Sequence, residues 1–127
     1  MSKGGDFKIR KEFVSLQDAN INVMTHAFLY GTACFEGIRG YWSEEENQLL
    51  VFRMREHYLR LLDSCKILRI NPGYTVDELC QITLEVLRRN GDREDVYIRP
   101  VFYKSTPAIG VRLSGLDDDF LVFAVPF

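Results

Sequence analysis

The stretch from Phe35 to Tyr41 alternates large side chains with small ones, and the chemistry it could carry is the binding of a small anion. Phe35, Gly37, Arg39 and Tyr41 would share one face of a strand, because successive side chains point to opposite faces. The glycine leaves bare backbone between an aromatic ring and a cation. Taken alone, the pattern is explained more simply by a half-exposed strand that bulges at its glycines.

A second stretch places a phenol, Tyr97, and a guanidinium, Arg99, on one strand face. Arginine can grip a carboxylate through two parallel hydrogen bonds. Pro100 follows and has no N–H for a strand ladder, which predicts a sheet edge or a bulge. The alternative is a surface pair at the exposed start of a strand. Because two stretches each combine an aromatic ring with an arginine, we favour a binding site.

Arg60 is a third candidate cation. It lies at the margin of an apolar stripe that includes Tyr58 and Leu61 on a predicted helix. Such an arginine commonly packs its stem on the core and extends its charge into water, and the sequence alone favours that interpretation. From the same place its guanidinium could reach a phosphate at the edge of a sheet.

Other residues that often carry chemistry lack suitable neighbours in the sequence. His26 and His57 have no spacing typical of a metal site or of a Ser/His/Asp arrangement, so we interpret both as helix-surface residues. Lys66 lies among charged helix positions and Lys104 precedes a loop, so both are rejected as nucleophiles. No base or cation beside Cys34 marks it as reactive. No metal site is predicted.

The elements that must position these residues predict an α+β domain, in which an antiparallel sheet packs with two main helices. Apolar periodicity predicts helices at 55–68 and 75–90, and Thr75 with Glu78 forms a capping box for the second. Thr25 and Gly31 bound a short helical turn at 26–30. Strands are predicted at 34–42, 48–53, 96–104 and 120–127, with a weaker pattern around Phe7, Ile9 and 13–14.

The length of 127 residues is that of one domain, here residues 1–127. The last strand is nearly all apolar, which predicts burial on both of its faces. Domain boundaries usually fall in polar sequence, so we expect a further domain to follow Phe127. Between the last two strands lies a long loop at 105–119, and loops of that length are often functional.

The composition narrows the class of protein. The chain is 46% hydrophobic and 27% charged, and its formal net charge of -2 argues against a general nucleic-acid or acidic-membrane binder. Three widely spaced cysteines without a CxxC pair favour free thiols in a reducing compartment. No apolar run approaches the roughly 18 residues that span a bilayer, and the start lacks a signal-peptide pattern. A soluble, cytoplasmic protein is the expectation.

Three blocks, YGTACFEGIRGYW, LVFRMREHYLRLLDSCKIL and YIRPVFY, resemble the N-terminal small domain of branched-chain amino acid aminotransferases, which are fold-type IV enzymes. The resemblance runs from about Val14 to the end. It implies pyridoxal 5'-phosphate (PLP) as cofactor and amino acids and 2-oxo acids as substrates. It also implies amino transfer between leucine, isoleucine or valine and 2-oxoglutarate, in a homodimer or higher homo-oligomer.

The resemblance also implies roles for single residues. Arg60 matches an arginine that binds the cofactor phosphate, and Tyr97 and Arg99 match residues that hold substrate carboxylates. The other matches line the substrate pocket: Phe35, Gly37, Arg39, Tyr30 and Val111. In the family the last two reach the active site of the neighbouring subunit.

No lysine of this chain matches the one that bonds the cofactor, which the family carries in its C-terminal domain. We therefore expect this chain alone to be inactive and not to retain PLP. Three alternatives stay open: a D-amino acid aminotransferase, an aminodeoxychorismate lyase, and a non-catalytic domain that self-associates. The joint presence of the FEGIRGY and YIRP blocks favours the branched-chain enzyme over the first two.

Overall fold

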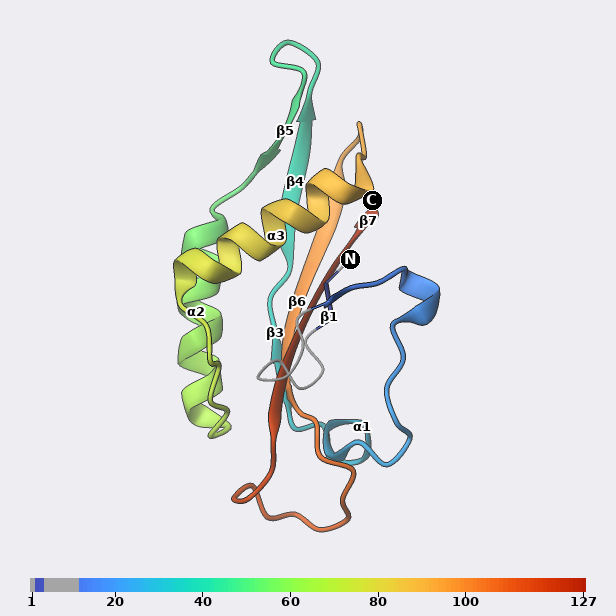
Figure 1. Cartoon of the computed structure of the whole chain (residues 1–127). Coiled ribbons are helices and arrows are strands. Elements are labelled where there is room, and N and C mark those ends of the chain that lie inside the picture. The colour runs from blue at the N-terminus through green and yellow to red at the C-terminus, as the bar shows by residue number, and fades with distance from the viewer. Residues whose placement is uncertain (1, 4–11) are drawn as a thin grey trace.

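The computed structural model describes residues 2–3 and 12–127, which form one antiparallel sheet with two long helices (Figure 1). In chain order the elements are β1 (Ser2–Lys3), β2 (Glu12–Phe13), η1 (Leu16–Asp18), α1 (His26–Tyr30), β3 (Ala33–Phe35), β4 (Ile38–Ser43), β5 (Gln48–Val51), α2 (Met54–Ile67), α3 (Val76–Asn90), β6 (Val96–Lys104) and β7 (Asp118–Pro126). The strand order is β2-β1-β7-β6-β4-β5, and β3 also pairs with β6. The predicted α+β class is confirmed.

Local sequence signals determine the two long helices. The backbone N–H of Glu78 donates to Thr75 Oγ1 at 3.1 Å, and that of Thr75 donates to Glu78 Oε1 at 2.9 Å, so the predicted capping box is present. Gly91, at φ 67°, ends α3 in the left-handed region that glycine tolerates. α2 begins one residue earlier and ends one residue earlier than predicted, and Arg69, at φ 55°, turns the chain away from it.

Strand register divides the sheet into two faces. Ile38 lies opposite Ile98 in the ladder, and Arg39 lies opposite Tyr97. The even-numbered residues of β4, β6 and β7 therefore share one face, and the odd-numbered residues share the other.

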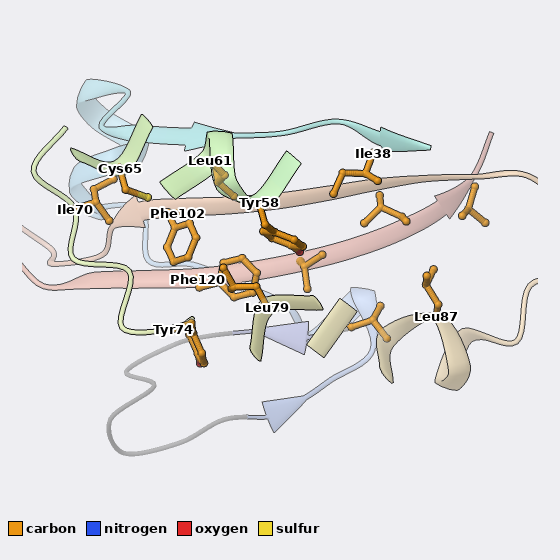
Figure 2. Packing of buried hydrophobic residues seen from close by; sticks show 14 residues of the cluster. Ile38, Tyr58, Leu61, Cys65, Ile70, Tyr74, Leu79, Leu87, Phe102 and Phe120 are labelled. Atoms are coloured by element: carbon orange, nitrogen blue, oxygen red, sulfur yellow. The ribbon is translucent and has the colours of Figure 1, made fainter. Parts of the chain in front are cut away.

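The even-numbered face carries the core, which α2 and α3 cover. Tyr58 and Leu61 from α2 and Leu79 from α3 pack against Phe102 and Phe120 of the sheet (Figure 2). The hydroxyls of Tyr58 and Thr83 are 2.5 Å apart and link the two helices, so the buried phenol has a partner.

The odd-numbered face is more open, which corrects one prediction. Expected burial of the last strand on both faces is wrong: Leu121, Phe123 and Val125 are only half-buried, and Phe127 is 72% exposed. The apolar run in β7 arises because one face packs on the helices while the other presents rings and aliphatic groups to the surroundings.

The strand predicted at 34–42 is interrupted at Glu36–Gly37. Phe35 pairs with Val101 and Ile38 pairs with Ile98, so the register continues across the gap. The N–H of Glu36 donates to the carbonyl of Pro100 at 3.2 Å, but Pro100 has no N–H to return the bond. A sheet edge at Pro100 is thus wrong, because β6 lies between β7 and the β3/β4 pair, and the proline instead marks the interruption.

The other predicted elements differ only at their ends. β6 spans the predicted residues, β5 stops at Val51, and β7 starts at Asp118. The helical turn α1 is present with Gly31 at φ 69°, although Thr25 makes no side-chain capping bond. β2 covers part of the weak N-terminal pattern, and Phe7 and Ile9 lie outside the described residues. No helix among residues 2–3 and 12–127 has the length and apolarity to cross a membrane.

Candidate functional site

The odd-numbered face brings Arg99, Tyr97 and Phe35 together from β6 and β3. Arg99 donates from Nε and Nη2 to the phenol oxygen of Tyr97, at 3.1 and 2.7 Å. Its guanidinium carbon lies 4.1 Å from the centre of the Phe35 ring. Cation–π contact and the bonds to the phenol hold the charge beside an exposed aromatic wall. The predicted grouping of a guanidinium, a phenol and a ring is present.

Gly37 is where the backbone approaches Tyr97. A Cβ at this position would lie 2.8 Å from Tyr97 Oη and 3.0 Å from Cε1 of the ring. The backbone expected to be bare is therefore covered by the phenol ring of Tyr97. Glycine is needed here because only a residue without a side chain lets the ring lie against the strand.

Arg39 adds a second cation to the same face. Its guanidinium carbon is 4.4 Å from the ring centre of Phe127 and 5.7 Å from that of Tyr41. Arg39 Nε is buried and has no hydrogen-bond partner in the described part of the chain. An unpaired buried donor costs free energy. An anionic ligand would recover that free energy by accepting a hydrogen bond from Nε.

Arg60 lies on α2 and pairs with Glu36 at the strand interruption. Arg60 Nε donates to Glu36 Oε2 at 2.8 Å, and Nη2 donates to Oε1 at 2.6 Å. His57 Nδ1 lies 2.8 Å from the same Oε1. The hydrogen bonds from Arg60, with a smaller contribution from His57, hold the pKa of Glu36 below its usual value although burial opposes this.

The guanidinium of Arg60 is accessible to a ligand. Its side chain is 69% exposed, and it lines a surface pocket with Phe52, Arg53, Glu56 and His57. Two of its five N–H groups bond to Glu36, which leaves three for other acceptors. Several free donors on one planar cation suit a phosphate monoester.

The residues that Arg99 and Arg60 contact are neighbours in the interrupted strand. Phe35 and Gly37 face the side of Arg99, whereas Glu36 between them faces α2 and Arg60. The interrupted strand therefore contacts Arg99 on one side and Arg60 on the other.

Tyr30 and Val111 belong to a second group, at the end of the sheet where α1 meets the loop between β6 and β7 (Figure 1). The N–H of Gly110 donates to Tyr30 Oη at 2.8 Å, and His26 Nε2 lies 2.5 Å from the carbonyl of Gly110. These bonds hold the backbone of Gly110, the residue before the exposed Val111, at the hydroxyl of Tyr30. The structure thus brings the segments that carry these two predicted residues together.

Both histidines differ from the prediction of helix-surface residues. His26 is 1% exposed, and its Nδ1 lies 2.9 Å from Thr32 Oγ1 while Nε2 meets Gly110. His57 is mostly buried against Glu36. Sequence reasoning missed Glu36 as well. The one available signal was a charged residue on the strand face predicted to hold Ile38, since a buried carboxylate needs a cationic partner.

Lys104 precedes the loop as predicted, because β6 ends with it, but its side chain is buried, which the sequence did not indicate. It is 2% exposed, and its Nζ donates to the carbonyl of Arg69 at 2.7 Å and pairs with Asp118 at 2.7 Å. Lys66 is exposed and lies 3.5 Å from Asp63. Neither ammonium is directed to the odd-numbered face, and no group of metal-ligating residues occurs within the described residues.

The chain folds as an α+β domain, and Arg99 and Arg60 on it are cations of the kind that suit carboxylate and phosphate groups. Residues 33–127 match the family described as amino-transferase class IV, and the chain belongs to that family. The chain is 48% identical over 102 residues to a probable branched-chain-amino-acid aminotransferase of Aquifex aeolicus, covering 77% of this chain and 33% of that protein.

Two solved structures show the same fold. The branched-chain aminotransferase of Thermoproteus uzoniensis with norvaline has a TM-score of 0.85 at 42% identity, over 93% of this chain and 38% of that one. A second branched-chain amino acid aminotransferase, complexed with N-(5'-phosphopyridoxyl)-L-glutamate, has a TM-score of 0.86 at 33% identity. The match covers 99% of this chain and 40% of that one. The sequence resemblance is confirmed, and the chain spans about a third of the length of its relatives.

Proposed function

We propose that the protein to which this chain belongs transfers amino groups between branched-chain amino acids and 2-oxoglutarate with PLP, and that residues 1–127 form its N-terminal small domain. The observation that carries the proposal is Arg99, held by Tyr97 over the ring of Phe35 on an open face. One face then offers both a cation for an acidic side chain and a ring for an aliphatic one.

PLP fits the residues present at Arg60. The exposed guanidinium has N–H groups left for a phosphate, and Arg53 lines the same pocket. When bound, PLP supplies the electron sink that lets the amino acid lose its Cα proton and pass on its nitrogen. Arg60 would hold the phosphate and so fix the position of the cofactor at the strand interruption.

Tyr97 and Arg99 would bind the carboxylates of the substrate. The phenol of Tyr97 can donate to the α-carboxylate, while Arg99 pairs with the side-chain carboxylate when glutamate is the amino donor. One of the two structural relatives is complexed with a phosphopyridoxyl derivative of L-glutamate, which supports a glutamate-accepting pocket. Phe35 and Arg39, on either side of Gly37, would bury an aliphatic side chain and neutralise an acidic one.

Tyr30 and Val111 would contact substrate in a neighbouring subunit of a homodimer or larger assembly. Their support is the bond from the N–H of Gly110 to Tyr30, which ties the loop that carries Val111 to α1. Apolar exposure of Val111 and Ile109 in the same loop suits burial against a partner. A cytoplasmic location stays a prediction.

The lysine that bonds the cofactor would lie in a second domain outside residues 1–127. Lys104 is committed to Asp118 and the Arg69 carbonyl, and Lys66 extends from the outer side of α2. Neither therefore reaches the proposed cofactor position, and we expect this chain alone to have no transaminase activity and to bind PLP weakly.

The test is an assay of the complete protein with PLP, in which glutamate formation from 2-oxoglutarate is measured with L-leucine or D-alanine as amino donor. Pyruvate release is measured separately with aminodeoxychorismate as substrate. We expect turnover with leucine, isoleucine and valine and none with D-alanine or aminodeoxychorismate. Residues 1–127 expressed alone serve as the matched control and should give no turnover. Preferential use of D-alanine or aminodeoxychorismate would reject the proposal in favour of the related enzymes.

A further inference from the structure

Glu36 is a buried carboxylate whose hydrogen-bond partners are cationic or can become so. Its side chain is 6% exposed, and it lies at the strand interruption between β3 and β4. Arg60 and His57, one helical turn apart on α2, both bond to it. A carboxylate so placed is tolerated because it is paired, and breaking the pairs would be costly.

The pairing holds Arg60 in one orientation. Both oxygens of Glu36 are engaged by the Nε and Nη2 groups of Arg60, a two-point contact that fixes the guanidinium plane. His57 bonds to Oε1 and thereby fixes the carboxylate itself. An arginine side chain on a helix surface otherwise samples many rotamers, and ordering it on ligand binding costs entropy.

The N–H groups that remain on Arg60 point away from Glu36. A contact through Nε and Nη2 leaves both N–H groups of Nη1 and one of Nη2 on the outer edges of the planar fork. The Arg60 side chain is 69% exposed and lines a surface pocket with Phe52 and Arg53. The same guanidinium can therefore hold Glu36 and a phosphate at once.

We propose that Glu36, supported by His57, is a positioning residue that fixes Arg60 for the phosphate group of the cofactor. The inference rests on the proposed function of Arg60 and adds a residue to it. Glu36 acts through Arg60 and does not touch the phosphate.

A competing arrangement predicts the opposite effect of removing Glu36 on phosphate binding. If Glu36 and the phosphate compete for Arg60, removing the carboxylate frees the arginine and strengthens phosphate binding. The burial difference argues against competition, because the side chain of Glu36 is 6% exposed whereas that of Arg60 is 69% exposed.

The experiment uses the complete protein without cofactor and compares two ligands that differ only in the phosphate, pyridoxamine 5'-phosphate and pyridoxamine. Dissociation constants are measured by absorbance or fluorescence titration. Glu36→Gln should weaken binding of the phosphorylated ligand about tenfold, the size expected for loss of a charge-assisted hydrogen bond, and leave pyridoxamine unchanged. Asp63→Asn changes an exposed carboxylate on α2, the helix that carries Arg60. It is the matched control and should change neither constant.

Two further variants separate the positioning of Arg60 from the effect of the negative charge and from a general loss of structure. Glu36→Asp keeps the negative charge but shortens its reach, so positioning predicts a similar loss and competition predicts none. In an Arg60→Ala background, Glu36→Gln should add no further loss, because its only route to the phosphate is gone.

Tighter binding of pyridoxamine 5'-phosphate by Glu36→Gln would overturn the inference in favour of competition. Equal losses for both ligands would also overturn it, in favour of a structural role alone. If Arg60→Ala leaves the phosphorylated ligand as tightly bound as before, the proposed function of Arg60 itself fails, which is a separate outcome from either.

Discussion

A Cβ atom built on Gly37 would lie 2.8 Å from the phenol oxygen of Tyr97. The backbone at Gly37 is held by ladder pairs on both sides, at Phe35 and Ile38, so the ring must yield to any side chain placed there. The odd-numbered face is open enough to let it move. Such a movement would break the bonds between Tyr97 and Arg99.

We therefore predict that Gly37→Ala in the complete protein alters substrate binding more than stability. The KM for glutamate should rise about tenfold, because a displaced Tyr97 no longer positions Arg99. The free energy of unfolding should fall by less than about 1 kcal/mol, since the ring shifts on an open face. Steady-state kinetics and denaturant unfolding measure the two effects.

Gly40→Ala is the matched control, because a Cβ there would meet Val96 Cγ2 at 2.8 Å. Val96 is fully buried in the core, so this variant should lose about 1–3 kcal/mol of stability while the KM of the folded enzyme stays unchanged. Equal effects of the two alanines on KM would contradict the assignment of the two faces.

Arg99→Ala should separate acidic from aliphatic substrates. Removing a charge-assisted contact worth about 2 kcal/mol raises the KM for glutamate roughly 30-fold, whereas leucine makes no ion pair with Arg99 and should lose little. The measured quantity is the ratio of the kcat/KM values for the two amino donors. Arg93→Ala is the control, since Arg93 stacks on Trp42 and bonds to Asn47 at the hairpin. Equal losses for glutamate and leucine would refute the role of Arg99.

Features determined by neighbouring residues could be predicted from the sequence. The Thr75–Glu78 capping box and the helix stop at Gly91 each depend on a few adjacent residues, and both are present. Strand alternation correctly placed Tyr97, Arg99, Phe35 and Gly37 on one face, because the period of two is intrinsic to a strand.

Features determined by distant residues could not be predicted. Glu36 meets Arg60 across 24 positions, Lys104 meets the Arg69 carbonyl across 35, and His26 meets Gly110 across 84. Nothing in the sequence beside Glu36, Lys104 or His26 identified these partners. The partner that makes burial tolerable comes from another element, and only the tertiary fold brings it near.

The Lys104–Asp118 pair should contribute strongly to stability. Both groups are largely buried, and Lys104 also ties the end of β6 to the turn after α2. Lys104→Met would leave Asp118 without its cationic partner and should cost about 3 kcal/mol in the free energy of unfolding. Lys66→Met, at an exposed pair with Asp63, should change it by less than about 1 kcal/mol. Similar denaturant midpoints for the two variants would contradict this ranking.

Glu36 should make stability depend on pH in the acid range. Its pKa in the folded protein lies below the ordinary value of 4.5, chiefly because of the hydrogen bonds from Arg60. A lowered pKa means that the stabilisation is complete above the unfolded-state value and is lost as the pH falls through the folded-state value.

The difference in unfolding free energy between the natural protein and Glu36→Gln should therefore be about 1–2 kcal/mol near neutral pH. It should shrink as the pH is lowered from about 5 to about 3. Denaturant titrations at a series of pH values measure it, with Glu44→Gln on the exposed hairpin as control. If the difference in unfolding free energy grows on acidification, folding does not lower the pKa of Glu36.

Cys34 and Cys65 form a thiol pair that the sequence did not indicate. Their sulfur atoms are 3.7 Å apart, between β3 and α2. A hydrogen bond from the Cys65 thiol lowers the pKa of Cys34, and this effect outweighs burial and the charge of Glu36. Burial raises the pKa of Cys80, so Cys34 and Cys80 should differ in reactivity.

Iodoacetamide labelling read by mass spectrometry at a series of pH values tests this difference, because only the thiolate reacts. Cys34 should react at lower pH than Cys80, which serves as an internal reference in the same sample. Cys65→Ala removes the donor and should move the midpoint for Cys34 to higher pH, whereas Cys65→Ser keeps a hydroxyl donor and should largely preserve it. An unchanged midpoint in Cys65→Ala would mean that the Cys65 thiol does not donate to Cys34, and the reactivity of Cys34 would then need another cause.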